Sequence, residues 1–239
     1  MTRRRGFLTL TLAVGGAATL LACSAWWRAP ARGLPSERGA PVLYVALGDS
    51  TVEGVGASRQ ELTYVVRLYE RLRAIYPTAQ LRNLGVGGST SADVLAAQVP
   101  PAVELAPHLV TLSVGPNDIT TRVSVREYEA NVRAILTRLA RETGAVIVVN
   151  LMPDLAVTPR FRDTPQRDLV GRLAAQFNEA LARQARAHGA EVVDLFEPSR
   201  AEVPARPELV SRDGYHPSDY GYARWAELVW PGIERRITR

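Results

Sequence analysis

The feature that most constrains the fold is an alternation of short apolar runs with longer segments of helical periodicity, which begins at Val42. The short runs are continuous or rich in β-branched residues, as in strands that are buried on both faces. We expect strands over residues 42–47, 80–83, 109–114, 145–150 and 191–195. The segments between them predict helices over residues 61–75, 91–98, 124–143, 166–188 and 218–237. This order is typical of an α/β domain with a mainly parallel five-stranded sheet and helices on both faces.

The N-terminal segment has a different character and predicts an export signal over residues 1–22. Arg3, Arg4 and Arg5 precede the uncharged, apolar stretch 7–21, and the second and third of these arginines resemble a twin-arginine signal. Residues 20–23, Leu-Leu-Ala-Cys, resemble a bacterial lipobox, in which cleavage would leave a lipid on Cys23. The alternatives are that Cys23 is an ordinary small residue near a cleavage site, or that it is part of an uncleaved anchor.

These segments predict three parts: the signal (residues 1–22), a tether (residues 23–41) and one folded domain (residues 42–239). The tether is rich in Pro, Arg and Trp. The lipobox interpretation places the protein outside the cytoplasm of a bacterium, as a lipoprotein held to the membrane through the lipid on Cys23.

Charge and cysteine content exclude several classes of function. The net charge is +5, but from Cys23 onward 26 basic residues stand against 24 acidic ones, which is no electrostatic footprint for nucleic acid. Cys23 is the only cysteine, so no disulfide can form within the chain. The three His residues and the lone Cys show no metal-ligand spacing, so we expect neither a metal nor an organic cofactor.

Polar clusters follow the predicted strands at the points where each strand ends. The clusters are residues 48–50 after the first strand, Gly85 after the second, residues 115–118 after the third, and residues 213–216 before the last helix. Functional groups of open α/β sheets gather outside the carboxyl ends of the strands. We therefore expect all four clusters at one edge of the sheet.

A hydrolytic serine in these clusters would need a base and a group that orients the base, because its hydroxyl is a poor nucleophile at neutral pH. His108 follows a Pro at the start of a predicted strand, and His188 precedes a Gly at the end of a predicted helix, so structural roles explain both. His216 lies three residues after Asp213 in a loop flanked by Gly and Pro. One turn there can bring the Asp213 carboxylate against the imidazole.

The four clusters, in this order, resemble the four blocks of the SGNH/GDSL hydrolases over the region from Leu43 to the C-terminus. The blocks are Gly-Asp-Ser at 48–50, the Gly-rich stretch 83–91, Gly-Pro-Asn-Asp at 115–118 and Asp-Gly-Tyr-His-Pro at 213–217. Each block alone could be an ordinary turn or helix cap. The resemblance implies a flavodoxin-like three-layer α/β/α fold and serine esterase activity.

Carried over residue by residue, the resemblance implies Ser50 as nucleophile, His216 as general base and Asp213 as the residue that holds the imidazole. It further implies that the oxyanion is bound by the N–H groups of Ser50 and Gly85 and by the side-chain amide of Asn117. Asp49 and Asp118 are assigned to loop structure.

The predicted reaction is hydrolysis of a carboxylic ester through an acyl-enzyme on Ser50, with a lysophospholipid, a short acyl ester or a thioester as substrate. The lipid candidates are motivated by the lipobox alone. Residues 153–166 are expected to border the acyl pocket. The alternatives are a carbohydrate O-acetylesterase of the same fold and a non-catalytic, flavodoxin-like binding module. Neither a complete Gly-x-Gly-x-x-Gly nor a P-loop occurs in the chain.

Overall fold

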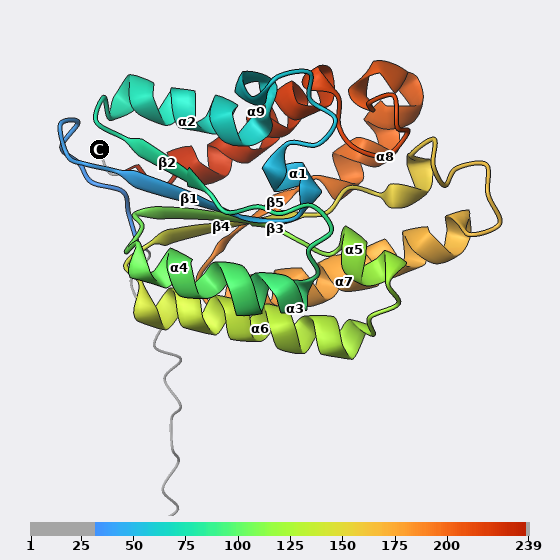
Figure 1. The fold of residues 1–239 in the computed structure, drawn as a ribbon, viewed down its shortest axis with the longest axis horizontal. Coiled ribbons are helices and arrows are strands. Elements are labelled where there is room, and N and C mark those ends of the chain that lie inside the picture. The colour runs from blue at the N-terminus through green and yellow to red at the C-terminus, as the bar shows by residue number, and fades with distance from the viewer. Residues whose placement is uncertain (1–31, 238–239) are drawn as a thin grey trace, which may run out of the picture.

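The computed structural model describes residues 32–237, in which a five-stranded sheet lies between two layers of helices (Figure 1). The strands are β1 (Leu43–Gly48), β2 (Gln80–Asn83), β3 (Leu109–Ser113), β4 (Val146–Leu151) and β5 (Glu191–Asp194). The helices are α1 (Ser50–Glu53), α2 (Tyr64–Ile75), α3 (Ser91–Asp93), α4 (Val99–Glu104), α5 (Pro116–Thr120), α6 (Val125–Glu142), α7 (Arg167–Ala187), α8 (Phe196–Ala205) and α9 (Asp219–Glu234). Short helical turns are η1 (Gln60–Leu62), η2 (Val94–Gln98), η3 (Leu155–Val157) and η4 (Pro207–Leu209).

The sheet is parallel throughout and has the strand order β2-β1-β3-β4-β5. Val45 of β1 pairs with Val110 of β3, which in turn pairs with Ile147 of β4. The predicted three-layer α/β fold is therefore confirmed. The chain turns from one side of β1 to the other after β2, so β1 and β3 flank the switch point at which sheets of this kind bind ligands.

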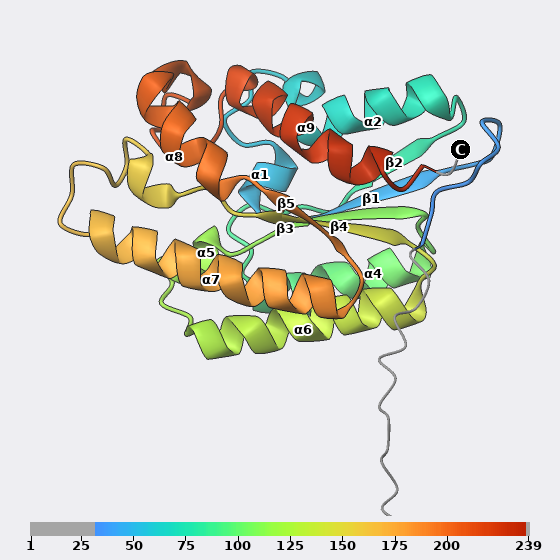
Figure 2. The same ribbon diagram turned by 180° about the vertical axis from the view of Figure 1, so that it is seen from behind.

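Both faces of the sheet are covered because its strands alternate side chains between two apolar cores. Val45 and Leu47 point into the core beneath α4, α6 and α7, whereas Tyr44 and Ala46 point into the core beneath α2 and α9. All four side chains are inaccessible to solvent. Figure 2 shows from behind how the two helix layers enclose the sheet. This burial fixes the strands and therefore the loops at their carboxyl ends.

Several helices were not predicted from the sequence. The short helices α1 and α5 directly follow β1 and β3, and α8 follows β5. The helix predicted over residues 91–98 instead continues as α3, the π-helical turn η2 and α4 to Glu104, with Pro100 and Pro101 in the first turn of α4. Proline is well tolerated there, since the first N–H groups of a helix have no partner within it.

The segment from Arg32 to residue 41, predicted as tether, packs on the domain instead. Leu34 is buried, and its N–H donates a hydrogen bond to the carbonyl of Arg236 at 2.6 Å. The Tyr76 hydroxyl donates to the carbonyl of Pro35 at 2.6 Å. The folded unit thus begins about ten residues before Val42, because burial of one leucine and these hydrogen bonds hold the segment in place.

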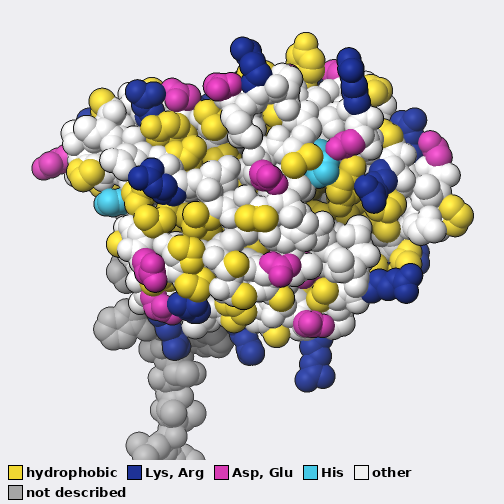
Figure 3. All heavy atoms as spheres, viewed as in Figure 1, with side chains coloured by type: hydrophobic (Ala, Val, Ile, Leu, Met, Phe, Trp, Pro, Cys, Tyr) yellow, Lys and Arg dark blue, Asp and Glu magenta, His cyan; other side chains and the backbone are white. Residues whose placement is uncertain are grey.

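The predicted export signal, Cys23 and the first part of the predicted tether lie outside the described residues. Within residues 32–237, no helix is both long and apolar enough to span a bilayer. The face of the molecule seen in Figure 3 carries Arg side chains interspersed with Asp and Glu side chains.

Candidate active site

The nucleophile candidate, Ser50, is the first residue of α1, directly after β1. Gly48, at the end of β1, has a φ of +148°, and a Cβ at this position would lie 1.9 Å from the Ser113 carbonyl oxygen. Only glycine fits this turn. The side chain of Asp49 then caps α1 by accepting a hydrogen bond from the Thr51 N–H at 2.9 Å. The strand end and the cap together fix Ser50 at the edge of the sheet.

His216 reaches Ser50 from the loop before α9. Its Nε2 lies 2.8 Å from the Ser50 Oγ, and its Nδ1 lies 2.6 Å from the Oδ2 of Asp213. The loop is closed by a bridge between Val210 and Pro217. The structure thus brings together the three side chains to which the sequence assigned nucleophile, base and orienting roles.

Hydrogen bonds fix the charge state of Asp213. Burial on its own raises the pKa of this carboxyl, but bonds from the His216 ring, the Ser211 hydroxyl and the N–H groups of Tyr215 and His216 outweigh burial. They hold the pKa of Asp213 well below its usual range. The group is therefore a carboxylate at neutral pH, which fixes the proton on the Nδ1 of His216 and leaves Nε2 free to accept the serine proton.

Asp49 is an unusual carboxyl because it is buried beside the nucleophile. Its side chain is 1% exposed, and burial raises its pKa to about 6. One oxygen caps α1 and accepts the Thr51 hydroxyl at 2.8 Å, while among the described residues the other oxygen has no hydrogen-bond partner. Asp49 therefore builds the turn, as expected from the sequence.

Two of the three predicted oxyanion donors are available at the site. No described residue accepts a hydrogen bond from the Ser50 N–H. One hydrogen of the Asn117 side-chain amide is bound by the Ser89 carbonyl at 3.0 Å, which leaves the second hydrogen free. Both groups lie at the switch point in the first turns of short helices, the first in α1 after β1 and the second in α5 after β3.

The assignment of Gly85 as the third donor disagrees with the structure. Its N–H donates to the side-chain oxygen of Asn83 at 3.0 Å, and a Cβ on Gly85 would lie 2.6 Å from the Cβ of Val52, behind Ser50. Gly88 is better placed. Its φ is +81°, its N–H has no partner among the described residues, and it precedes Ser89, which binds Asn117.

Two carboxylates brace this glycine loop, and sequence reasoning missed the role of the first. Glu53 of α1 accepts the Gly87 N–H at 2.7 Å, and a Cβ on Gly87 would lie 3.8 Å from the Cβ of Ser50. Asp118 is fully buried and accepts the N–H of Ser91 at 2.9 Å. Burial raises the pKa of Asp118, although its bonds to Ser91 oppose the shift. The loop is thus held beside the nucleophile from both ends.

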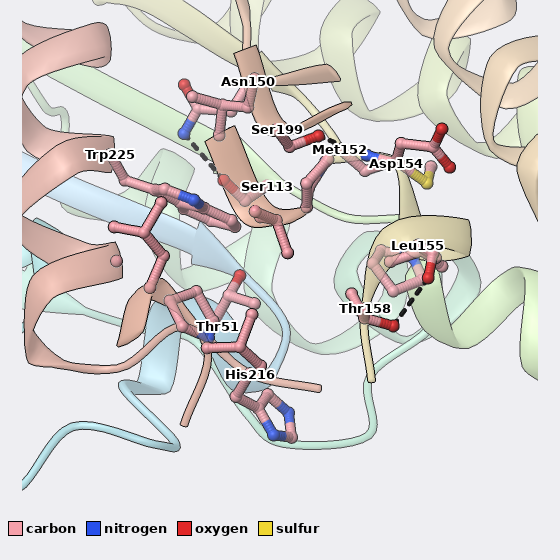
Figure 4. Close-up of a pocket in the computed structure, with 18 of the residues that line it drawn as sticks. Thr51, Ser113, Asn150, Met152, Asp154, Leu155, Thr158, Ser199, His216 and Trp225 are labelled. Carbon is pink, nitrogen blue, oxygen red and sulfur yellow. Dashed lines mark hydrogen bonds between the residues drawn. The ribbon is translucent and has the colours of Figure 1, made fainter. Parts of the chain in front are cut away.

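A mostly apolar pocket opens beside Ser50 and His216. Figure 4 shows it with His216 at one end, Asn150 and Ser113 at the other, and Trp225 facing Leu155 and Thr158 across it. Its apolar lining includes Met152, Leu155, Leu195, Leu209, Trp225 and Leu228. The expectation that residues 153–166 border the pocket is confirmed for its first part, since residues 153–155 and 158 line the wall.

The buried polar atoms that lack a partner all belong to residues of this pocket. Within residues 32–237 they are one oxygen each of Asp49 and Asn150 and the hydroxyl of Tyr215. Water or a bound substrate could satisfy them. The Tyr215 ring meets the Phe161 ring edge to face, and the Arg160 guanidinium lies 4.9 Å from the Tyr215 centroid. In the described part of the chain, no group of His, Cys, Asp and Glu side chains is arranged to hold a metal ion.

Comparison with known proteins supports the geometry. The GDSL-like lipase/acylhydrolase family model matches residues 46–224. A GDSL-like esterase of Mycobacterium tuberculosis is 29% identical over 199 residues, which cover 80% of this chain and 61% of the relative, so this chain spans less than two thirds of that protein. Esterase TesA of Pseudomonas aeruginosa is 24% identical over 201 residues, which cover 84% of this chain and 92% of TesA.

Solved structures show the same fold. A crystal structure of TesA superposes with a TM-score of 0.66 at 23% identity, covering 83% of this chain and 100% of TesA. The acetyl xylan esterase AlAXEase superposes with a TM-score of 0.65 at 18% identity, covering 80% of this chain and 100% of that enzyme.

Proposed function

We propose that this chain, which belongs to the GDSL-like lipase/acylhydrolase family, is a carboxylic ester hydrolase that cleaves acyl esters through an acyl-enzyme on Ser50. The observation that carries this proposal is the relay from Ser50 through His216 to Asp213, with distances of 2.8 and 2.6 Å, at the opening of an apolar pocket.

In the acylation step, the Ser50 Oγ attacks the ester carbonyl carbon while the Nε2 of His216 takes the serine proton. Asp213 stabilises the imidazolium that forms. The tetrahedral intermediate collapses as the C–O bond to the alcohol breaks, and His216 returns the proton to the leaving oxygen. Water then enters, loses a proton to His216 and attacks the acyl-enzyme, which releases the carboxylic acid and restores Ser50.

Negative charge that develops on the carbonyl oxygen would be bound by the N–H groups of Ser50 and Gly88 and by the free amide hydrogen of Asn117. These donors are fixed before the substrate arrives, so little reorganisation accompanies the reaction. Loss of one such donor typically costs on the order of 2.7–4 kcal/mol of transition-state stabilisation.

The pocket suits a hydrocarbon acyl group. Its apolar lining consists of leucine, proline and valine side chains together with Met152 and Trp225, and its volume is about 70 Å³. One water needs about 10–15 Å³ by this measure, so the pocket suits a few methylene groups. We therefore place the acyl chain in the pocket and the alcohol or thiol in the open part of the site. A short acyl ester, a lysophospholipid or a thioester supplies such a group.

Attachment to a membrane is a separate part of the proposal and rests on the sequence. A lipid on Cys23 would hold the enzyme on the extracytoplasmic side of a bacterial membrane.

The test is hydrolysis of p-nitrophenyl esters from acetate to palmitate by the full chain and by its Ser50→Ala variant. We expect activity on at least the short esters and its loss in the variant, with unchanged thermal unfolding. A serine-directed organophosphonate should label the parent chain and leave the variant unlabelled. An inactive, folded parent chain that also resists labelling would contradict the proposal. Faster hydrolysis of acetylated xylose than of any p-nitrophenyl or lipid ester would favour the carbohydrate esterase instead.

A further inference from the structure

One wall of the pocket is held to the rest of the molecule mainly by polar side-chain contacts. This wall is α8, and the helix opposite is α9; both contribute lining residues, including Val203 from α8 and Leu228 from α9. Ser199 is the only buried residue of α8, and Pro204 lies inside the helix. The apolar core therefore holds α8 weakly, and its position depends on polar contacts with its neighbours.

Among the described residues, one pair of side chains makes the hydrogen bonds between α8 and α9. The guanidinium of Arg224 makes a two-pronged contact with the carboxylate of Glu202, which we call the fork. Its Nη2 lies 2.8 Å from Oε1, and its Nε lies 2.9 Å from Oε2. Such a two-pronged contact fixes direction as well as distance. The Nη1 of the same guanidinium donates to the carboxylate of Glu227, one turn further along α9, at 3.1 Å.

The pair lies between the pocket and solvent. Glu202 and Arg224 both line the pocket, yet their side chains are 24% and 32% exposed. Glu227, in contrast, does not line the pocket, and its side chain is 55% exposed. The fork therefore spans the gap between the two helices, with apolar pocket on one side and water on the other.

We propose that the fork between Glu202 and Arg224 closes the side of the acyl pocket and sets the longest acyl chain that the enzyme accepts. This inference rests on the proposed esterase function and narrows its substrates to esters of short acyl chains. A longer chain would have to pass between α8 and α9. It would separate the fork and leave both charged groups against hydrocarbon, which is strongly unfavourable.

The experiment measures kcat/KM on p-nitrophenyl esters from acetate to palmitate. The variants are the double substitution Glu202→Ala with Arg224→Ala, and the exchange Glu202→Arg with Arg224→Glu. Opening the wall should raise the ratio of palmitate to butyrate hydrolysis at least about tenfold, the scale at which hydrophobic pockets discriminate chain length. The exchange should restore most of the length limit.

Glu227→Ala is the matched control, because it removes a partner of Arg224 that does not line the pocket. Its chain-length profile should equal that of the parent. In the parent chain, high salt should weaken the partly exposed fork and raise the same ratio. This second measurement needs no variant and therefore remains valid if the double substitution fails to fold.

The proposal is overturned if the profile is unchanged in the double variant, or if the parent chain already hydrolyses palmitate as fast as butyrate. An equal shift in Glu227→Ala would also overturn it. These outcomes differ from failure of the esterase function, in which the folded parent chain would hydrolyse no ester at all.

Discussion

The reactive edge of the sheet and the α8 wall of the pocket are built in opposite ways. Ser50 and Asn117 lie in the first turns of short helices that follow buried strands, and Gly88 lies on a loop held by the carboxylates of Glu53 and Asp118. The α8 wall has one buried residue and is held by polar contacts to Asp154 and Arg224. The difference shows that the catalytic residues lie on the rigid part of the fold. The proposed limit on acyl-chain length depends instead on α8, whose contacts can be changed without altering the catalytic residues.

The largest effect should follow from Asp213→Asn, which tests the rigid edge. An amide beside Nδ1 no longer fixes the proton there, so Nε2 is no longer held as the proton acceptor. We expect kcat to fall by about 10³–10⁴ on every ester, as for loss of the orienting carboxylate in serine proteases. The ratio between long and short esters should not change. A loss confined to long esters would show that the edge and the pocket wall are not independent.

The next effect should come from Asn117→Ala, which removes one oxyanion donor. We expect kcat to fall by about 10²–10³ with little change in KM, because this donor acts on charge that develops in the transition state. Steady-state kinetics on a short ester checks the prediction. Asn83→Ala frees the Gly85 N–H without touching Gly88, and it should change kcat far less. A rise in kcat in Asn83→Ala would favour Gly85 over Gly88, because the freed Gly85 N–H would then add a donor for the oxyanion.

Asp49 makes the rigid edge sensitive to pH. Its pKa is about 6 in the folded chain, above the ordinary value of 3.8, so the folded state binds the proton more tightly than the unfolded state. The protonated Asp49 therefore contributes about 3 kcal/mol to the free energy of unfolding. This contribution is fully present below about pH 3.8 and is lost as pH rises through about 6. In Asp49→Asn this loss should disappear, because an amide does not titrate and can still cap α1.

Chemical unfolding of Asp49→Asn and the parent chain at pH 4, 6 and 8 tests this prediction. Identical pH dependence in the two proteins would contradict it. The variant Asp213→Asn is a useful contrast, since the folded-state pKa of Asp213 is lowered and its contribution to stability is lost at acidic pH instead.

The smallest effect in this series should come from Glu53, which braces the glycine loop without touching the substrate. Glu53→Ala removes the acceptor of the Gly87 N–H, so kcat should fall about tenfold. This corresponds to a rise of about 1.4 kcal/mol in the activation free energy. Glu53→Gln keeps an acceptor oxygen and should recover most of this loss. Glu61→Ala, on the exposed turn η1, is the control. Equal losses in the Ala and Gln variants would show that charge, and not the hydrogen bond, is what matters.

How far the sequence predicts this molecule depends on how local each feature is. The central strands β1, β3 and β4 are recognisable because each is a mainly apolar run, and β1 lies one residue from its predicted position. The edge strand β2 has a single apolar residue, Leu81, and is largely exposed. Asp213 and His216 are three residues apart, so one turn joins them. These features need no knowledge of distant contacts.

The features that the sequence does not reveal depend on contacts between distant segments. Glu53 and Gly87 are 34 residues apart, and no local pattern pairs them. Three glycines follow Asn83 within five residues, and only the path of the loop decides which N–H stays free. Helix α8 has two prolines and little amphipathic character, so periodicity does not reveal it.

The chain enters the domain at the end of the sheet that lies remote from the catalytic serine. Arg32 donates to the carbonyls of Thr143 and Ala145, at the start of β4, whereas Ser50 follows the carboxyl end of β1, at the opposite edge of the sheet. If a lipid on Cys23 anchors the protein, as proposed, the anchor joins the domain at the end of the sheet remote from Ser50, so that attachment and catalysis use different ends of the domain.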